Sequence, residues 1–234
     1  MAEVFQRYEE KYLISAPQYA VLFEALAPYM TVDAYGKTAI GSLYFDTPDF
    51  YLIRTSLEKP VYKEKLRLRS YGRPGPDSPA FVELKKKYEG IVYKRRISLP
   101  YQQALRQLQQ GYLAEEGQIA EEINWCLSYY ETLAPAAALF YERLALYCVY
   151  DQAIRITFDE NIRYRFSALD LALGDSGTPL LAPGMRLMEL KFPGSMPLWL
   201  SRVLNEAEVF PTSFSKYGTA YLERCGKKGE SKSA

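Results

Sequence analysis

The chain has 234 residues, 48% of them hydrophobic, and its 29 Lys and Arg residues nearly balance 28 Asp and Glu residues. Histidine is absent, which excludes Ser-His-Asp and Cys-His catalysis, histidine-ligated zinc and a phosphohistidine intermediate. Cys126, Cys148 and Cys225 lie far apart and form no metal-binding pair, and no phosphate-binding loop of the Walker type occurs. Without a long apolar run or a signal segment, we expect a cytoplasmic protein.

The first quarter of the chain predicts two strands and two helices. Val4–Ile14 alternates charged residues on one face with apolar residues on the other. Ser15 and Gln18 have the spacing of a capping box, which predicts a helix after this strand. The other predicted elements are a strand over Thr38–Phe45 and a helix that begins near Asp46.

The middle of the chain predicts three strands with a concentrated positive charge. Between Lys59 and Arg96, twelve basic residues stand against four acidic ones. The strands are Tyr62–Ser70, Ala80–Tyr88 and Ile91–Leu99, the last two joined by a turn at Glu89-Gly90. Each alternates a charged face with a mainly Leu, Val and Ile face. The charged faces consist of Lys63, Lys65, Arg67, Arg69, Glu83, Lys85, Lys87, Lys94 and Arg96.

The rest of the chain predicts further helices and strands and a polar tail. Helices are expected from Pro100, near Glu115 and from Ser195, strands over Phe140–Tyr150, Ala153–Asp159, Asn161–Phe166 and Arg186–Phe192, and a loop over Ser167–Gly184. Gly226–Ala234 has the composition of a disordered segment. The tyrosines and phenylalanines sit at core spacings, so we expect a packing shell and not exposed stacking platforms.

About nine strands with helices between them predict an α+β fold, a closed antiparallel β-barrel with helices packed outside. We expect a single domain over residues 1–225 and a disordered tail over 226–234. The apolar strand faces then contact the helices, and the charged faces point inward. Simple cross-strand pairing, for example of Arg67 and Arg69 with Glu83 and Glu189, is the alternative explanation of these charges. Because inward cations outnumber inward carboxylates, a polyanion site is favoured.

Several short segments occur in an order known from one family. They are Arg7–Tyr12, Tyr44–Thr47, Lys65–Arg69 with Tyr71-Gly72, Phe81–Lys85, Tyr141–Arg143, Arg155–Asp159, Glu189–Lys191 and Ser213–Tyr217. Together they resemble the VTC domain, the catalytic domain of the vacuolar transporter chaperone complex. This domain is a polyphosphate polymerase of the CYTH-like triphosphate tunnel metalloenzyme superfamily. The resemblance runs from about Phe5 to about Tyr221.

The resemblance implies a β-tunnel in which basic side chains hold the phosphates of ATP and of a growing chain, and a glutamate anchors Mn²⁺ or Mg²⁺. The implied phosphate-binding catalytic residues are Lys11, Arg67, Arg69, Lys85, Lys94, Arg143, Arg155 and Lys216. Tyr141 is implied to assist them, and we assign Lys191 and Arg163 to the same substrate-binding group. Glu189 and Glu9 are the candidate metal ligands, and the alternative role for Glu9 is that of a counter-ion for Lys and Arg.

Two positions depart from the patterns of these relatives. Arg7 replaces the first glutamate of the superfamily's Glu-x-Glu-x-Lys pattern, so a two-metal hydrolase site is not expected there. Ser213 stands where the VTC pattern often has a lysine, which predicts weaker affinity for a long product chain.

We therefore expect a metal-dependent transferase that adds the terminal phosphate of ATP to inorganic polyphosphate. The alternatives are a tripolyphosphatase or nucleoside triphosphatase on the same fold, and a non-catalytic polyphosphate-binding module. No nucleic-acid partner is expected, because few aromatic residues are predicted at the surface. The chain has no membrane segment, so we expect it to act alone or with a separate membrane partner.

Overall fold

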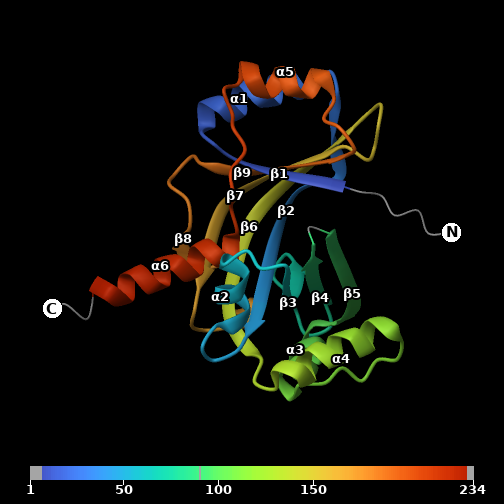
Figure 1. Ribbon diagram of the computed structural model, residues 1–234, viewed down its shortest axis with the longest axis vertical. Helices are drawn as coiled ribbons and strands as arrows, with labels where there is room; N and C mark the ends of the chain where they lie inside the picture. Colours follow the sequence, from blue (N-terminus) through green and yellow to red (C-terminus); the bar gives the residue numbers. More distant parts are fainter. Residues whose placement is uncertain (1–6, 90, 231–234) are drawn as a thin grey trace. The chain divides into compact units, whose positions relative to one another are not determined.

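The computed structural model describes residues 7–89 and 91–230, which form an α+β fold built on a nine-stranded antiparallel sheet (Figure 1). The strands are β1 (Arg7–Ile14), β2 (Met30–Asp46), β3 (Tyr62–Tyr71), β4 (Pro79–Tyr88), β5 (Ile91–Pro100), β6 (Ala134–Cys148), β7 (Arg155–Arg165), β8 (Thr178–Pro179) and β9 (Arg186–Pro193). The helices are α1 (Ala16–Leu26), α2 (Tyr51–Leu57), α3 (Tyr101–Gln110), α4 (Gln118–Tyr130), α5 (Leu198–Glu206) and α6 (Lys216–Glu230), with a 3₁₀ turn, η1 (Leu171–Leu173). Among the described residues, no helix is long and apolar enough to cross a bilayer.

The strands are hydrogen-bonded in the order β1-β9-β7-β6-β2-β3-β4-β5, and β8 pairs with β7. The predicted α+β class and antiparallel sheet are confirmed. The path has two ends, β1 and β5, so hydrogen bonds among the described strands do not close the sheet, and this order is consistent with the barrel-like tunnel that we expected.

The chain divides into two compact units, each assembled from segments that are distant in sequence. Unit 1 takes its described residues from 1–38, 141–162 and 181–214, and unit 2 from 39–140, 163–180 and 215–234. Strands β2, β6 and β7 each contribute residues to both units. The expectation of a single domain stays a prediction.

In unit 1, the apolar face of β1, β7 and β9 packs on helices α1 and α5, which lie side by side (Figure 1). The core includes Leu22 from α1, Phe158 from β7 and Leu190 from β9, all buried. The predicted capping box starts α1: the backbone N–H of Gln18 donates to Ser15 Oγ, and that of Ser15 donates to Gln18 Oε1 at 3.0 Å. Burial of one face leaves the alternate residues of these strands on the other face.

In unit 2, the apolar face of β3 and β4 packs on α3 and α4. Leu66 and Leu84 are fully buried against a cluster that includes Leu108 of α3 and Ile123 of α4. These leucines alternate with the charged residues of the same strands, so the charges face away from the helices. The predicted faces of these strands are confirmed.

Three predictions about single elements are corrected. The segments Ala153–Asp159 and Asn161–Phe166 are not two strands but one, β7, which bends at Asn161 where φ is +52°. Asparagine tolerates this left-handed conformation, so the strand continues after the bend.

Residues 226–230, expected to be disordered, continue helix α6, and residues 231–234 lie outside the described part of the chain. The predicted loop between β7 and β9 contains η1 and β8. Val4–Gln6 of the first predicted strand and Gly90 of the predicted turn also lie outside the described residues.

Candidate functional site

The face of β3, β4 and β5 that points away from the helices carries a dense set of cations. Cross-strand register aligns the side chains in rows, so that Lys65, Lys85 and Lys94 lie directly opposite one another. The next row holds Arg67 and Arg96 on either side of Glu83. We call this surface the basic face; it consists of Lys63, Lys65, Arg67, Arg69, Lys85, Lys87, Lys94 and Arg96, with the single carboxylate Glu83.

Glu83 is the centre of the basic face. Its side chain is 1% exposed and contacts four cations. Oε2 lies 2.7 Å from Arg67 Nη2 and 3.8 Å from Arg69 Nη1, while Oε1 lies 2.7 Å from Lys94 Nζ and also accepts from Arg96. Burial alone would raise the pKa of Glu83, but the surrounding cations outweigh burial and lower it well below its usual range. One carboxylate therefore orients four cationic side chains and neutralises only one charge.

Tyr44 of β2 borders the basic face. Its ring stacks on that of Tyr217, with centroids 4.6 Å apart, and Arg67 Nη1 donates to its hydroxyl at 3.0 Å. Burial favours the neutral phenol, but Arg67, Lys65 and Arg69 outweigh burial and lower the pKa of Tyr44 to about 8. This hydroxyl loses its proton more readily than an ordinary tyrosine does.

The start of helix α6 adjoins the same face. Lys65 Nζ donates to Ser215 Oγ at 3.2 Å, and Ser215 Oγ accepts from the backbone N–H of Gly218 at 3.2 Å. The predicted site residue Lys216 is the first residue of this helix. The positive end of the helix dipole adds to the local potential for anions.

Unit 1 presents a second polar face, formed by β1, β9 and β7. Glu9 lies opposite Lys191, which lies opposite Arg155, and Lys11 lies opposite Glu189, which lies opposite Thr157. We call this surface the mixed face; it consists of Glu9, Lys11, Arg155, Thr157, Glu189 and Lys191, with Arg143 beside Glu189.

Charge pairs organise the mixed face. The Glu9 carboxylate lies 3.4 Å from Lys11 Nζ and 3.7 Å from Lys191 Nζ, which is the geometry of a counter-ion. Lys11 Nζ also donates to the backbone carbonyl of Phe214 at 3.2 Å. Arg155 is exposed at the start of β7.

Arg143 is held by two carboxylates. Its guanidinium binds Asp159 in a bidentate manner, with distances of 2.6 and 2.7 Å, and Nη2 lies 3.6 Å from Glu189 Oε2. The guanidinium also lies over the Tyr141 ring, 5.3 Å from its centroid. Asp159 is fully buried, so this pair fixes the guanidinium plane beside Glu189.

Arg163 is separated from the mixed face by the bend of β7 and belongs to unit 2. Its Nη1 lies 3.5 Å from Asp175 Oδ2, and both side chains are exposed. The neighbouring Arg165 donates to the backbone carbonyls of Asp170, Gly174 and Ser176 and so anchors the loop after β7. The structure therefore places Arg163 beside a loop aspartate.

Sequence reasoning did not assign roles to several residues in or beside these faces, among them Lys65, Arg96, Tyr44 and Asp159. Lys65 and Arg96 alternate with apolar residues like the assigned cations, so the same pattern could have identified them. Tyr44 and Asp159 acquire their roles from partners on other strands, which alternation along one strand does not reveal.

The donor set for a divalent cation is small. Among the described residues, no group of three or more Asp, Glu, Cys or His side chains could hold a metal. Glu189 offers a carboxylate, and the hydroxyl of Thr157, opposite it in the ladder, is buried and has no hydrogen-bond partner in the described part of the protein. Mg²⁺ and Mn²⁺ prefer such oxygen donors, and Mg²⁺ commonly takes its other ligands from phosphates and water.

The fold is found in several solved structures. The chain is similar to a Hippeastrum protein, HpAC1, described as a candidate adenylyl cyclase with a dominant triphosphatase activity, with a TM-score of 0.58 and 17% identity over 94% of this chain and 96% of that one. It is also similar to a candidate adenylate cyclase from Vibrio parahaemolyticus, with a TM-score of 0.50 and 10% identity over 93% of this chain and 98% of that one. A comparison with curated protein sequences gave no match.

The strand order, the helix-covered apolar faces and these similarities define a protein of the CYTH-like triphosphate tunnel fold. The family is given by the sequence itself, because the profile of the VTC domain matches residues 6–223. The chain belongs to the VTC domain family, as the resemblance predicted.

Proposed function

We propose that this protein is a metal-dependent polyphosphate polymerase that transfers the terminal phosphate of ATP to inorganic polyphosphate. The observation that carries the proposal is the basic face, where eight cations share a surface with one carboxylate in a chain of the VTC domain family. Phosphoryl transfer requires aligned phosphates and compensation of their charge more than it requires covalent help from the protein.

The basic face has the properties that phosphate binding needs. Arg67 and Arg69 can each offer two parallel N–H donors to phosphate oxygens, whereas Lys85 acts as a point charge. Glu83 keeps the cations in position before the substrate arrives, so less conformational entropy is lost on binding. Lys94 and Lys216 would contact other phosphates of the same polyanion.

The mixed face supplies the second part of the proposal. Glu189 would hold the divalent ion, with Arg143 beside it and Tyr141 against the Arg143 guanidinium. When bound, the ion would neutralise phosphate charge and orient the γ-phosphoryl group. Glu9 would act as a counter-ion for Lys11 and Lys191 and not as a metal ligand, because both ammonium groups already surround it.

In the proposed reaction, a terminal oxygen of polyphosphate forms a bond to the γ-phosphorus of ATP. The bond between the γ-phosphorus and the bridging oxygen breaks, and ADP leaves with that oxygen. The cations of this chain hold both anions and compensate the charge that develops on the leaving group.

The test is to incubate the purified protein with ATP and Mn²⁺ or Mg²⁺ and to measure ADP, polyphosphate and orthophosphate separately. We expect ADP and polymer in the wild type and their loss in Lys85→Ala and Arg67→Ala. Lys86→Ala is the matched control, because Lys86 is adjacent in sequence but points to the opposite face, where it contacts Glu122. Equal activity in Lys85→Ala and Lys86→Ala would refute the assigned site.

A hydrolase is the second candidate, since the similar Hippeastrum protein is described as a triphosphatase. It predicts orthophosphate in place of polymer from the same reaction mixture. The two candidates share the binding residues, so the product and not the mutations distinguishes them.

A further inference from the structure

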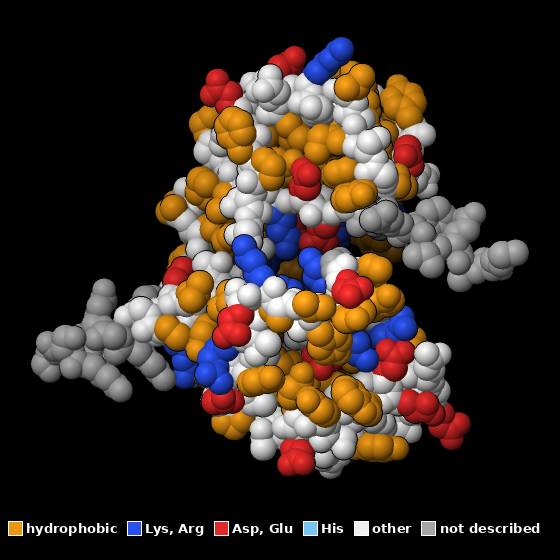
Figure 2. Space-filling model, viewed as in Figure 1, with side chains coloured by type: hydrophobic (Ala, Val, Ile, Leu, Met, Phe, Trp, Pro, Cys, Tyr) orange, Lys and Arg blue, Asp and Glu red, His pale blue; other side chains and the backbone are white. Residues whose placement is uncertain are grey.

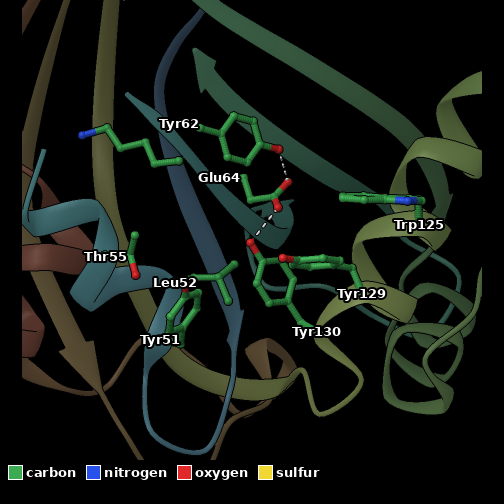
Figure 3. A pocket seen from close by; sticks show the side chains of 9 residues that line it. Tyr51, Leu52, Thr55, Tyr62, Glu64, Trp125, Tyr129 and Tyr130 are labelled. Atoms are coloured by element: carbon green, nitrogen blue, oxygen red, sulfur yellow. Dashed lines mark hydrogen bonds between the residues drawn. The ribbon is translucent and has the colours of Figure 1, made fainter. Parts of the chain in front are cut away.

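An aromatic pocket lies in unit 2 on the side of β3 opposite to the basic face. Its volume is about 210 Å³, and it opens between α2, β3 and α4 (Figure 3). The lining side chains are Tyr51, Leu52, Thr55, Tyr62, Lys63, Glu64, Trp125, Tyr129 and Tyr130. Of the basic face, Lys63 at the start of β3 also lines this pocket, and the proposed reaction uses neither Lys63 nor the pocket.

A buried carboxylate forms the base of the aromatic pocket. Glu64 is 3% exposed, and Figure 3 shows Tyr62 and Tyr130 pointing toward it. The Tyr62 hydroxyl donates to Oε2 at 3.0 Å, and the Tyr130 hydroxyl donates to Oε1 at 2.8 Å. Burial, together with Glu64, raises the pKa of both hydroxyls, so both remain donors. A carboxylate has about four acceptor positions, and these two bonds leave acceptor capacity for a ligand.

The walls are aromatic rings exposed to solvent. Trp125 and Tyr129 stack with centroids 5.0 Å apart, and Tyr129 meets Tyr130 edge-on at 4.9 Å. Trp125 is 55% exposed and Tyr129 64% exposed, and hydrophobic side chains gather at the surface over α2, β3 and α4 (Figure 2). We expected aromatic residues to form a packing shell; at this surface that expectation is wrong, because these rings line an open pocket.

A lysine of the protein already lies against one ring of the pocket. Lys86 Nζ lies 5.9 Å from the Trp125 ring centroid while it contacts Glu122 of α4. The other lysine, Lys63, donates its Nζ hydrogen to the Ser56 carbonyl at the end of α2. The Lys63 ammonium is therefore engaged with a backbone carbonyl at the end of α2. The carboxylate at the base of the pocket is that of Glu64.

We propose that the aromatic pocket binds the alkylammonium group of a small organic amine. Aromatic faces attract cations, and a desolvated carboxylate favours a positive charge that can donate hydrogen bonds to it. The same carboxylate disfavours anions, which separates this site from the phosphate chemistry of the basic face. A volume of about 210 Å³ is below the roughly 300–1,000 Å³ of sites for drug-sized ligands, so the pocket fits one short amine chain.

The experiment uses the fluorescence of Trp125. The chain has two tryptophans, so Trp199→Phe leaves Trp125 as the single reporter. Titration with pentylamine is expected to give a saturable change, whereas 1-pentanol, of similar size but neutral, is expected to give none. Equal responses to the two probes would mean apolar partitioning and would overturn the proposal.

Variants locate the binding site. We expect Glu64→Gln to weaken pentylamine binding by at least about tenfold, the usual effect of removing a charged hydrogen-bond partner. Tyr129→Leu keeps the carboxylate and should also weaken binding. Glu121→Gln is the matched control and should have no effect, because Glu121 is an exposed carboxylate on α4, the helix that also carries Tyr129.

Circular dichroism of each variant separates loss of binding from loss of fold. If Glu64→Gln does not fold, Tyr129→Leu alone tests the site. An affinity of Tyr129→Leu for pentylamine equal to that of the parent protein would then overturn the proposal. An equal loss in Glu121→Gln would indicate nonspecific charge attraction and would also overturn it. Tighter binding of a lysine-containing peptide than of pentylamine would point to a protein partner instead of a small amine.

Discussion

Glu83 stabilises the protein by holding cations that would otherwise repel one another. We expect Glu83→Gln to lower the free energy of unfolding by about 3–5 kcal/mol, the usual cost of leaving buried charges without their partner. Urea denaturation measures this change. Glu122→Gln is the control, because Glu122 pairs Lys86 and Arg95 on the more exposed, opposite side of the sheet. Tripolyphosphate should restore more stability to Glu83→Gln than to the wild type, since the polyanion replaces the missing charge. Equal losses in the two variants would mean that Glu83 has no special role.

Tyr44 is expected to make anion binding dependent on pH. The pKa of its hydroxyl is about 8, below the ordinary 10.0, so the folded protein loses this proton at a lower pH than the unfolded chain does. As pH rises through 8, the tyrosinate forms beside Arg67 and weakens the binding of phosphates. The same group adds stability that appears above pH 8 and is complete above the ordinary pKa of tyrosine.

Calorimetric titration with tripolyphosphate below and above pH 8 tests this expectation. The affinity should fall across this range in the wild type and fall less in Tyr44→Phe, which has no hydroxyl to ionise. An identical pH dependence in both proteins would show that another group is responsible.

At the scale of elements, Asp46 joins the end of β2 to helices α2 and α6. Oδ1 accepts from the backbone N–H groups of Thr47 and Leu52, and Oδ2 accepts from the N–H of Ile53 and the hydroxyl of Tyr217. We expect Asp46→Ala to lower the free energy of unfolding by roughly 3–5 kcal/mol, because several buried donors lose a charged acceptor. Asp49→Ala, an exposed aspartate of the same loop, should change stability little. Thermal denaturation of the two variants provides the comparison.

Local periodicity predicted some elements well and others poorly. The faces of β3 to β5 were predictable because Lys and Arg alternate with Leu and Val. Successive side chains of a strand point to opposite faces, so turning the apolar residues toward the helices places the cations on the other face. The bend at Asn161 was not predictable, because Asn after two acidic residues also suits a turn, and pairing with β6, β8 and β9 keeps the strand continuous.

Contacts between distant segments account for what the sequence did not predict. The end of α6 contains Gly226 and two lysines, a composition that favours disorder, whereas the helix continues through residue 230. The aromatic pocket draws its rings from α2, β3 and α4, so no single segment contains its pattern. Arg165 was indistinguishable from Arg163 by alternation, because its partners are backbone carbonyls of a loop.

At the scale of the whole molecule, a polyanion that binds the cationic surfaces should stabilise the folded chain. A ligand at about 100 times its dissociation constant adds about 2.7 kcal/mol to the free energy of unfolding. We therefore expect tripolyphosphate to raise the melting temperature, and added salt to reduce the effect because it screens the cations. Lys85→Ala should show a smaller shift than Lys86→Ala. Equal shifts in these variants would indicate binding elsewhere.

The pairing of β1 with β9 also governs how the chain can fold during synthesis. Arg7 meets Pro193 in the ladder, so the first strand leaves the ribosome long before its partner exists. At about 5–20 residues per second, the delay is roughly ten to forty seconds. Throughout this interval the buried side chains of β1, including Tyr12 and Ile14, have no ladder partner from β9 and need protection from aggregation. We therefore expect the nascent segment that contains β1 to need shielding until β9 has been translated.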